Sequence, residues 1–94
     1  IQAKRIYTNG LTDILVKPLE NRELAVCFLN KSNERKHMIL PIMKIHNEAY
    51  VDLPIAKEYE CKDLWEKEST IITNNIDCFV EPHGVKVYRI KIKQ

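Results

Sequence analysis

The chain has 94 residues and a mass of 11.1 kDa, which suffices for one hydrophobic core but not for two. Fifteen Lys and Arg residues against thirteen Asp and Glu residues give a formal net charge of +2, which argues against a nucleic-acid-binding arm. The longest uncharged stretch, residues 69–76, is far shorter than the roughly twenty apolar residues of a membrane-spanning helix. We therefore expect one folded domain over residues 1–94, with neither nucleic acid nor a membrane as its partner.

The start of the sequence lacks an initiator Met, a signal-peptide core and a cleavage pattern, so we expect a piece of a longer protein. The three cysteines, Cys27, Cys61 and Cys78, fit neither a dense disulfide framework nor a CxxC redox motif. Buried, reduced thiols are the favoured interpretation, which leans toward a cytoplasmic location. The alternative is one disulfide between Cys61 and Cys78, with Cys27 left free.

In the first part of the chain, residues 11–17 and 38–43 have the composition of β-strands. Pro41 restricts the second of these strands to a sheet edge or a bulge. Two further segments, 18–25 and 56–62, are rich in good helix formers but also contain the alternation of strands. The residues alone therefore leave helix and strand open for both segments.

The clearest alternation lies near the C-terminus, where residues 76–80 and 86–93 are predicted as strands. Between them, residues 81–84 supply the turn chemistry of Glu-Pro-His-Gly, so we predict a hairpin. The last strand has an apolar face of Tyr88, Ile90 and Ile92 and a basic face of Arg89, Lys91 and Lys93. Residues 24–29 differ because they are apolar at every position, as in a strand buried on both faces.

Residue spacing does not indicate a metal or a nucleophile. Zinc sites need closely spaced Cys or His pairs, and the sequence has none, so we predict neither a metal nor a cofactor. A pair of Cys78 and His83 is better explained as a core thiol and a loop histidine. Glycoside hydrolysis needs two carboxylates, but an acidic cluster interspersed with lysines is more typical of a solvated strand face. That cluster consists of Glu58, Glu60, Asp63, Glu66 and Glu68.

Aromatic side chains and one sequon raise the question of carbohydrate. Tyr59 and Trp65 are candidates for a sugar-binding platform, because pyranose faces stack on aromatic rings, whereas a place in the core is the alternative. Asn30-Lys31-Ser32 matches the N-glycosylation sequon, which matters only for a secreted eukaryotic protein.

Four sequence pieces occur in a characteristic order: Leu15-Val16-Lys17-Pro18-Leu19, residues 24–32, Asp63-Leu64-Trp65 and residues 80–89. Together they make residues 1–93 resemble the C-terminal β-sandwich domain of family 27 glycoside hydrolases, the α-galactosidases. The resemblance implies an all-β, antiparallel β-sandwich of about 7–8 short strands with Greek-key-like connections.

The resemblance also assigns the remaining segments. Both ambiguous segments become strands, and residues 20–23 become a hairpin loop in which Asn21-Arg22 stand where relatives usually carry glycine. Residues 44–54 are expected to form a longer, irregular connection. In the corner at residues 63–65, the Asp63 carboxylate should accept turn N–H bonds while Leu64 and Trp65 anchor the loop in the core.

In the family that this sequence resembles, both catalytic aspartates and the galactose pocket belong to an N-terminal (β/α)₈ barrel. None of that barrel lies in these residues, so we expect no catalytic residue here. The implied partner is the barrel of a parent enzyme that hydrolyses terminal α-galactosides. We hypothesise that Val85 and Val87, which point away from the core face of the last strand, pack on that barrel.

Two other functions compete with this accessory role. An independent carbohydrate-binding module would expose Trp65 or Tyr59 on a platform. An interaction module that pairs through an edge strand is disfavoured by the lysine-rich face of the last strand.

Overall fold

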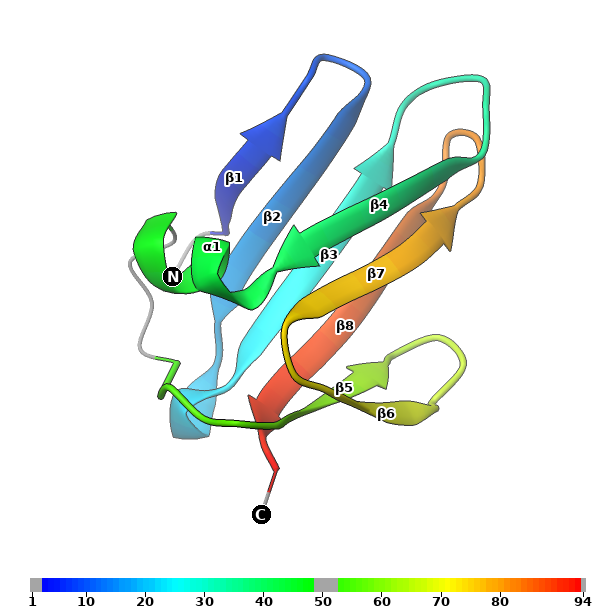
Figure 1. Cartoon of the computed structure of the whole chain (residues 1–94). Helices are drawn as coiled ribbons and strands as arrows, with labels where there is room; N and C mark the ends of the chain where they lie inside the picture. Colours follow the sequence, from blue (N-terminus) through cyan, green and yellow to red (C-terminus); the bar gives the residue numbers. More distant parts are fainter. Residues whose placement is uncertain (1–2, 49–52, 94) are drawn as a thin grey trace.

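Residues 3–48 and 53–93 are described by the computed structural model, in which two antiparallel sheets pack face to face (Figure 1). The six-stranded sheet has the order β1-β2-β3-β8-β5-β6, and the second sheet pairs β4 with β7. The elements are β1 Lys4–Thr8, β2 Thr12–Pro18, a 3₁₀ turn Glu20–Arg22, β3 Leu24–Asn30, β4 Lys36–Pro41, α1 Ile42–Glu48, β5 Tyr59–Asp63, β6 Ser69–Ile72, β7 Asn75–Val80 and β8 Val85–Ile92. The predicted all-β antiparallel sandwich is confirmed. Over the described ranges, no helix is long and apolar enough to cross a membrane.

The path of the chain explains the strand order. Strands β1, β2 and β3 follow one another as antiparallel neighbours, and the chain then crosses to the small sheet for β4. After β5 and β6 it returns to the small sheet for β7, and finally β8 inserts between β3 and β5 (Figure 1). A last strand that returns beside an earlier one is the arrangement of Greek-key sandwiches.

The core lies between the two sheets and follows the two-residue period of the strands. In β3, Leu24, Val26 and Phe28 are buried, whereas the residues between them are half-buried on the outer face. The ring of Tyr88 in β8 meets Phe28 edge to face, with 5.9 Å between the ring centroids. Ile90, the next inward residue of β8, is fully buried, so the predicted core face of the last strand is confirmed.

The loop between β2 and β3 is the predicted hairpin loop. Asn21 and Arg22 both have left-handed backbones, with φ angles of 61° and 59°. The backbone N–H of Leu19 donates to the carbonyl of Glu23 at 2.8 Å, which closes the loop. Asn tolerates this conformation well, so a non-glycine residue can hold the turn.

The predicted hairpin between residues 76–80 and 86–93 is wrong. Both segments are strands, but β7 pairs with β4 in the small sheet and β8 pairs with β3 and β5 in the large one. The turn at residues 81–84 does form, because Gly84 N–H donates to the Glu81 carbonyl at 2.9 Å. Alternation identifies a strand and turn residues identify a reversal, but neither specifies which sheet the next strand joins.

The prediction for residues 38–43 needs a correction at its C-terminal end. Strand β4 pairs only with β7 and ends at Pro41, and α1 begins at Ile42. Ile42 and Ile45 are buried at the three-residue spacing of a helix face, which a short apolar run does not distinguish from a strand. The irregular connection predicted for residues 44–54 is therefore wrong for 44–48, which are helical, while 49–52 lie outside the described residues.

Candidate functional site

The outer face of the six-stranded sheet carries an apolar stripe across its three central strands. Leu15 of β2 pairs with Cys27 of β3, and Cys27 pairs with Val87 of β8. In the adjacent row, Leu29 of β3 pairs with Val85 of β8. All five side chains alternate with inward-facing core residues, and none is fully buried; Val85 is 40% exposed. We call Leu15, Cys27, Leu29, Val85 and Val87 the outer stripe.

The outer stripe is bordered by charged side chains that form ion pairs within the domain. Asp13 accepts hydrogen bonds from the hydroxyl of Thr8 and lies 3.0 Å from the Lys31 ammonium. The pKa of Asp13 is lowered, mainly by the hydrogen bond from Thr8 and next by the hydrogen bond from Lys31. On the opposite side of the stripe, Arg89 forms an ion pair with Glu23. An apolar centre with a polar rim is the usual composition of an interface.

A shallow depression of about 380 Å³ adjoins the outer stripe at its loop end. Leu29 and Val85 form its apolar wall, and His83 and Gly84 of the β7–β8 turn also line it. The His83 ring is held by the Asn33 side-chain oxygen, 2.7 Å from Nε2. The stripe therefore ends in a hollow that is large enough to receive side chains of a partner.

Beside the N-terminal half of β8, the turn after β5 is organised by Asp63, which pairs with Tyr88. Its Oδ1 accepts the backbone N–H groups of Trp65 at 2.8 Å and of Glu66 at 3.1 Å, as predicted from the sequence. Its Oδ2 lies 3.3 Å from the Lys86 ammonium. Burial opposes ionisation of this carboxyl, but the two backbone N–H groups and Lys86 outweigh burial, so the pKa of Asp63 lies below its usual value.

The predicted anchoring of Leu64 and Trp65 in the core is wrong. Leu64 is 43% exposed and Trp65 is 67% exposed. Because Asp63 is the last inward-facing residue of β5, Leu64 falls on the outer face and Trp65 lies beyond the end of the strand. Leu64 N–H donates to the Val87 carbonyl at 3.0 Å, which places Leu64 directly beside the outer stripe.

Tyr59 is not available as a sugar platform. It is 1% exposed because it faces inward on β5, two residues before Cys61. Its hydroxyl donates to the Pro54 carbonyl at 2.7 Å and accepts the Ala56 N–H at 2.9 Å. Of the two predicted platform residues, only Trp65 presents its ring to solvent.

The described thiols are free and suited to the core rather than to catalysis. Burial raises the pKa of Cys61 to about 12 and that of Cys78 to about 11. Cys78 shares a side-chain hydrogen bond with Tyr88, whereas His83 bonds to Asn33, so they do not form a nucleophile and base pair. Among residues 3–48 and 53–93, no three His, Cys, Asp or Glu side chains are grouped as metal ligands.

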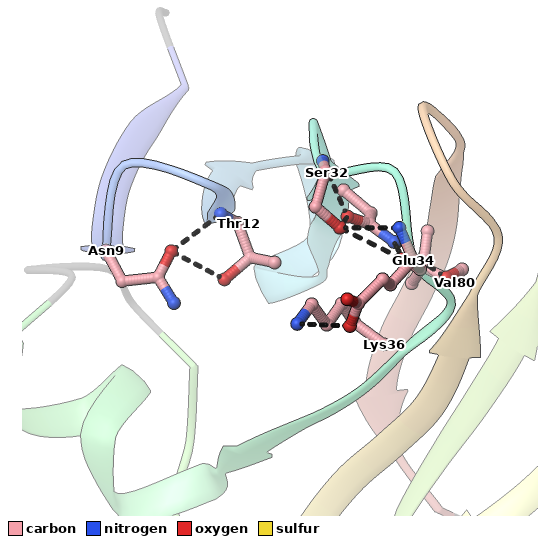
Figure 2. A network of polar contacts seen from close by, with 7 residues as sticks. Asn9, Thr12, Ser32, Glu34, Lys36 and Val80 are labelled. Atoms are coloured by element: carbon pink, nitrogen blue, oxygen red, sulfur yellow. Dashed lines mark hydrogen bonds and ion pairs between the residues drawn. The ribbon is translucent and has the colours of Figure 1, made fainter.

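The sequon asparagine belongs to a buried polar network, and Figure 2 labels its partners Ser32, Glu34 and Val80. Asn30 is 1% exposed, and its Nδ2 donates to the carbonyls of Glu34 at 2.7 Å and Val80 at 2.9 Å. Its Oδ1 accepts the backbone N–H of Ser32 at 2.9 Å and the Ser32 hydroxyl at 2.6 Å. All four hydrogen-bonding positions of this amide are therefore used inside the fold.

Sequence reasoning named Val85 and Val87 but missed the other members of the outer stripe, Leu15, Cys27 and Leu29. The signal was present in residues 24–29, which are apolar at every position. One face of that strand packs in the core, and the apolar residues on its other face require a second contact surface as their explanation.

Several solved structures share this fold. They include α-galactosidase I from Mortierella vinacea, with 24% identity and a TM-score of 0.84 over 97% of this chain and 23% of the other. A GH27 β-L-arabinopyranosidase from Geobacillus stearothermophilus gives 14% identity and a TM-score of 0.83 over 99% of this chain and 20% of the other. The α-galactosidase from Saccharomyces cerevisiae gives 14% identity and a TM-score of 0.74 over 99% of this chain and 33% of the other. This chain thus spans a third or less of each of these proteins.

A search of curated proteins gives no match. The sequence model of the alpha galactosidase C-terminal beta sandwich domain matches residues 9–90, which is most of the chain. It covers β2 to most of β8, including the outer stripe and the Asp63 turn. The chain belongs to the family of α-galactosidase C-terminal β-sandwich domains.

Proposed function

We propose that this chain is the non-catalytic accessory domain of an α-galactosidase-like glycoside hydrolase, and that its outer stripe packs on the catalytic barrel of that parent enzyme. The observation that carries the proposal is the outer stripe itself. Val87 continues an apolar row that runs through Cys27 to Leu15 across three strands, and Val85 pairs with Leu29 in the adjacent row. In a sheet with one face in water, the residues of that face are normally polar. A contiguous apolar stripe there indicates a contact surface.

The charges around the stripe support the same role. The carboxylates of Asp13 and Glu23 are already paired with Lys31 and Arg89 within the domain. A partner can therefore cover the stripe without leaving these carboxylates unpaired, which would be costly. The depression beside Val85 adds a shape that a convex partner can fill.

The proposal assigns the reaction to the barrel. The parent would hydrolyse terminal α-galactosides with two barrel aspartates, and this domain would supply neither. Two acidic residues of the cluster at residues 58–68 form ion pairs within the fold: Glu58 lies 3.6 Å from Lys93 and Asp63 lies 3.3 Å from Lys86. An assay with a chromogenic α-galactoside tests this division: the parent should be active and the 94-residue chain inactive, and an active 94-residue chain would refute it.

The packing role is tested with Val85→Ser/Val87→Ser in the parent enzyme and in the isolated chain. Burial of a valine side chain contributes about 1.5 kcal/mol or more, so the parent should lose about 1–3 kcal/mol of stability. The isolated chain, where these residues already contact water, should lose under about 1 kcal/mol. Scanning calorimetry of all four proteins measures the difference.

Ile39→Ser is the matched control. Ile39 is also an apolar strand residue, is 51% exposed, and lies on β4 of the small sheet, away from the outer stripe. Its substitution removes a similar β-propensity without touching the proposed interface. Equal losses in parent and isolated chain for the double valine variant would show that the outer stripe has no partner.

A further inference from the structure

The Asp63 turn is held rigidly while it exposes its two largest apolar side chains. Five hydrogen bonds fix its backbone: two N–H groups to Asp63 Oδ1, Lys67 N–H to the Asp63 carbonyl, Asp63 N–H to Glu68 and Leu64 N–H to Val87. Lys67 takes a left-handed backbone with a φ angle of 60°, which a non-glycine residue adopts at a cost. The turn therefore maintains one shape although its side chains contribute little to the core.

The exposed Trp65 contributes little to the stability of the domain itself. A tryptophan that is 67% exposed forgoes most of the stabilisation that its large apolar surface would give on burial. Its neighbour Leu64 is 43% exposed on the same turn. Tryptophan is enriched among residues that dominate interface energies, and a rigid backbone lowers the entropic cost of using it there.

The turn continues the surface that the proposed function already uses. Leu64 N–H bonds to the carbonyl of Val87, so the cross-strand row Leu15, Cys27, Val87 extends to Leu64. Trp65 is the next residue of the same turn, beyond the end of β5. The apolar surface thus runs from β2 across β3 and β8 to the turn after β5.

We propose that Leu64 and Trp65 form a preorganised anchor that inserts into the same catalytic barrel on which the outer stripe packs. This inference rests on the proposed function, because the occupant is the barrel of the parent enzyme. The outer stripe supplies the broad contact, and Trp65 supplies the residue that fixes the position of the barrel against the domain. Asp63 acts as a positioning residue that presents both side chains.

The test compares Trp65→Ala, Trp65→Phe and Lys67→Ala in the parent enzyme and in the isolated chain. Lys67→Ala is the control, since it changes an exposed residue of the same turn without removing apolar surface. The melting temperature of the parent should fall with Trp65→Ala, recover in part with Trp65→Phe and stay unchanged with Lys67→Ala. The isolated chain should melt at the same temperature with either Trp65 substitution.

A second readout reports directly on the indole. Trp65 is the only tryptophan of the 94-residue chain, so its fluorescence there should be strongly quenched by acrylamide. In the parent labelled with 5-fluorotryptophan, the ¹⁹F resonance that Trp65→Phe removes should be shielded from a soluble paramagnetic agent. An equally accessible resonance in the parent would overturn the proposal.

The outcomes separate this inference from the proposed function. If Val85→Ser/Val87→Ser destabilises the parent and Trp65→Ala does not, the packing role stands and the anchor is refuted. If neither variant destabilises the parent more than the isolated chain, both the packing role and the anchor are refuted. If Trp65→Ala leaves the parent stable but abolishes binding of the chain to galacto-oligosaccharides, the anchor is refuted in favour of a carbohydrate-binding role for Trp65.

Discussion

The side chain of Asn30 and the backbone of Val80 join the two sheets of the sandwich. Nδ2 of Asn30, at the end of β3, donates to the carbonyl oxygen of Val80, at the end of β7, at 2.9 Å. These residues are fifty positions apart in the sequence and lie in different sheets. The same amide also holds the β3–β4 turn through Glu34 and Ser32 (Figure 2).

Asn30→Ala should be one of the more destabilising substitutions in the chain. It would leave the carbonyls of Glu34 and Val80 and the N–H of Ser32 without their partner in a buried site. We expect a loss of about 2–4 kcal/mol, measured by urea unfolding. Asn33→Ala, which removes an exposed amide bonded to the exposed His83, should cost under about 1 kcal/mol.

The folded chain should not accept an N-glycan, although it carries the Asn30-Lys31-Ser32 sequon. A glycosylated Nδ2 could not keep both of its carbonyl contacts in a site that is 1% exposed. An oligosaccharyltransferase should therefore modify a peptide of residues 26–36 but not the folded chain. Mass spectrometry reads the result, and a glycan on folded chain of undiminished stability would contradict the buried position of Asn30.

The Asp63 carboxyl should make stability dependent on pH in the acid range. Its pKa is lower in the folded chain than the ordinary 3.8, so its contribution is present above about pH 4 and is lost as pH falls through the lower folded value. Asp63→Asn keeps the oxygen that accepts the turn N–H bonds but loses the charge opposite Lys86. We expect the variant to be about 1–2 kcal/mol less stable at pH 7.

That deficit should shrink when the carboxyl of the unsubstituted chain is protonated. Urea unfolding at pH 7, 4 and 2.5 measures it, and a deficit independent of pH would contradict the lowered pKa. Asp13 has a lowered pKa as well, so Asp63→Asn should retain some acid sensitivity. The Asp13→Asn/Asp63→Asn double variant should show the weakest pH dependence.

The sequence predicts faces more reliably than partners. The two-residue period of β8 places Tyr88 and Ile90 toward the core, as the structure has them, because burial alternates with every residue of a strand. Which strand pairs with β8 depends on contacts with distant segments, so the predicted hairpin with β7 failed. Family resemblance, rather than propensity, correctly assigned residues 59–62 of the helix-prone segment 56–62 to a strand, whereas residues 56–58 are irregular.

The candidate site shows the same division between local and distant information. The hydrogen bonds of Asp63 are local, and its place before a turn was enough to predict them. The exposure of Trp65 depends on where the edge of the sheet lies in three dimensions. The general tendency of tryptophan to be buried therefore led to a wrong prediction that Trp65 lies in the core.

The most direct test of the packing role uses Cys27, which lies in the middle of the outer stripe. In a Cys61→Ala/Cys78→Ala background it is the only thiol of this domain, half-buried and free in the isolated chain. Burial raises its pKa, so labelling by a maleimide should be measured at alkaline pH. In the parent, any further cysteines are distinguished by peptide mapping.

If the barrel covers the outer stripe, Cys27 should be labelled at least about ten times more slowly in the parent than in the isolated chain, in proportion to the rarity of local opening. Denaturing the parent should restore the labelling rate of Cys27, which would show that the thiol itself is intact. Equal labelling rates in the native parent and the isolated chain would contradict the central claim that this face of the domain is an interface.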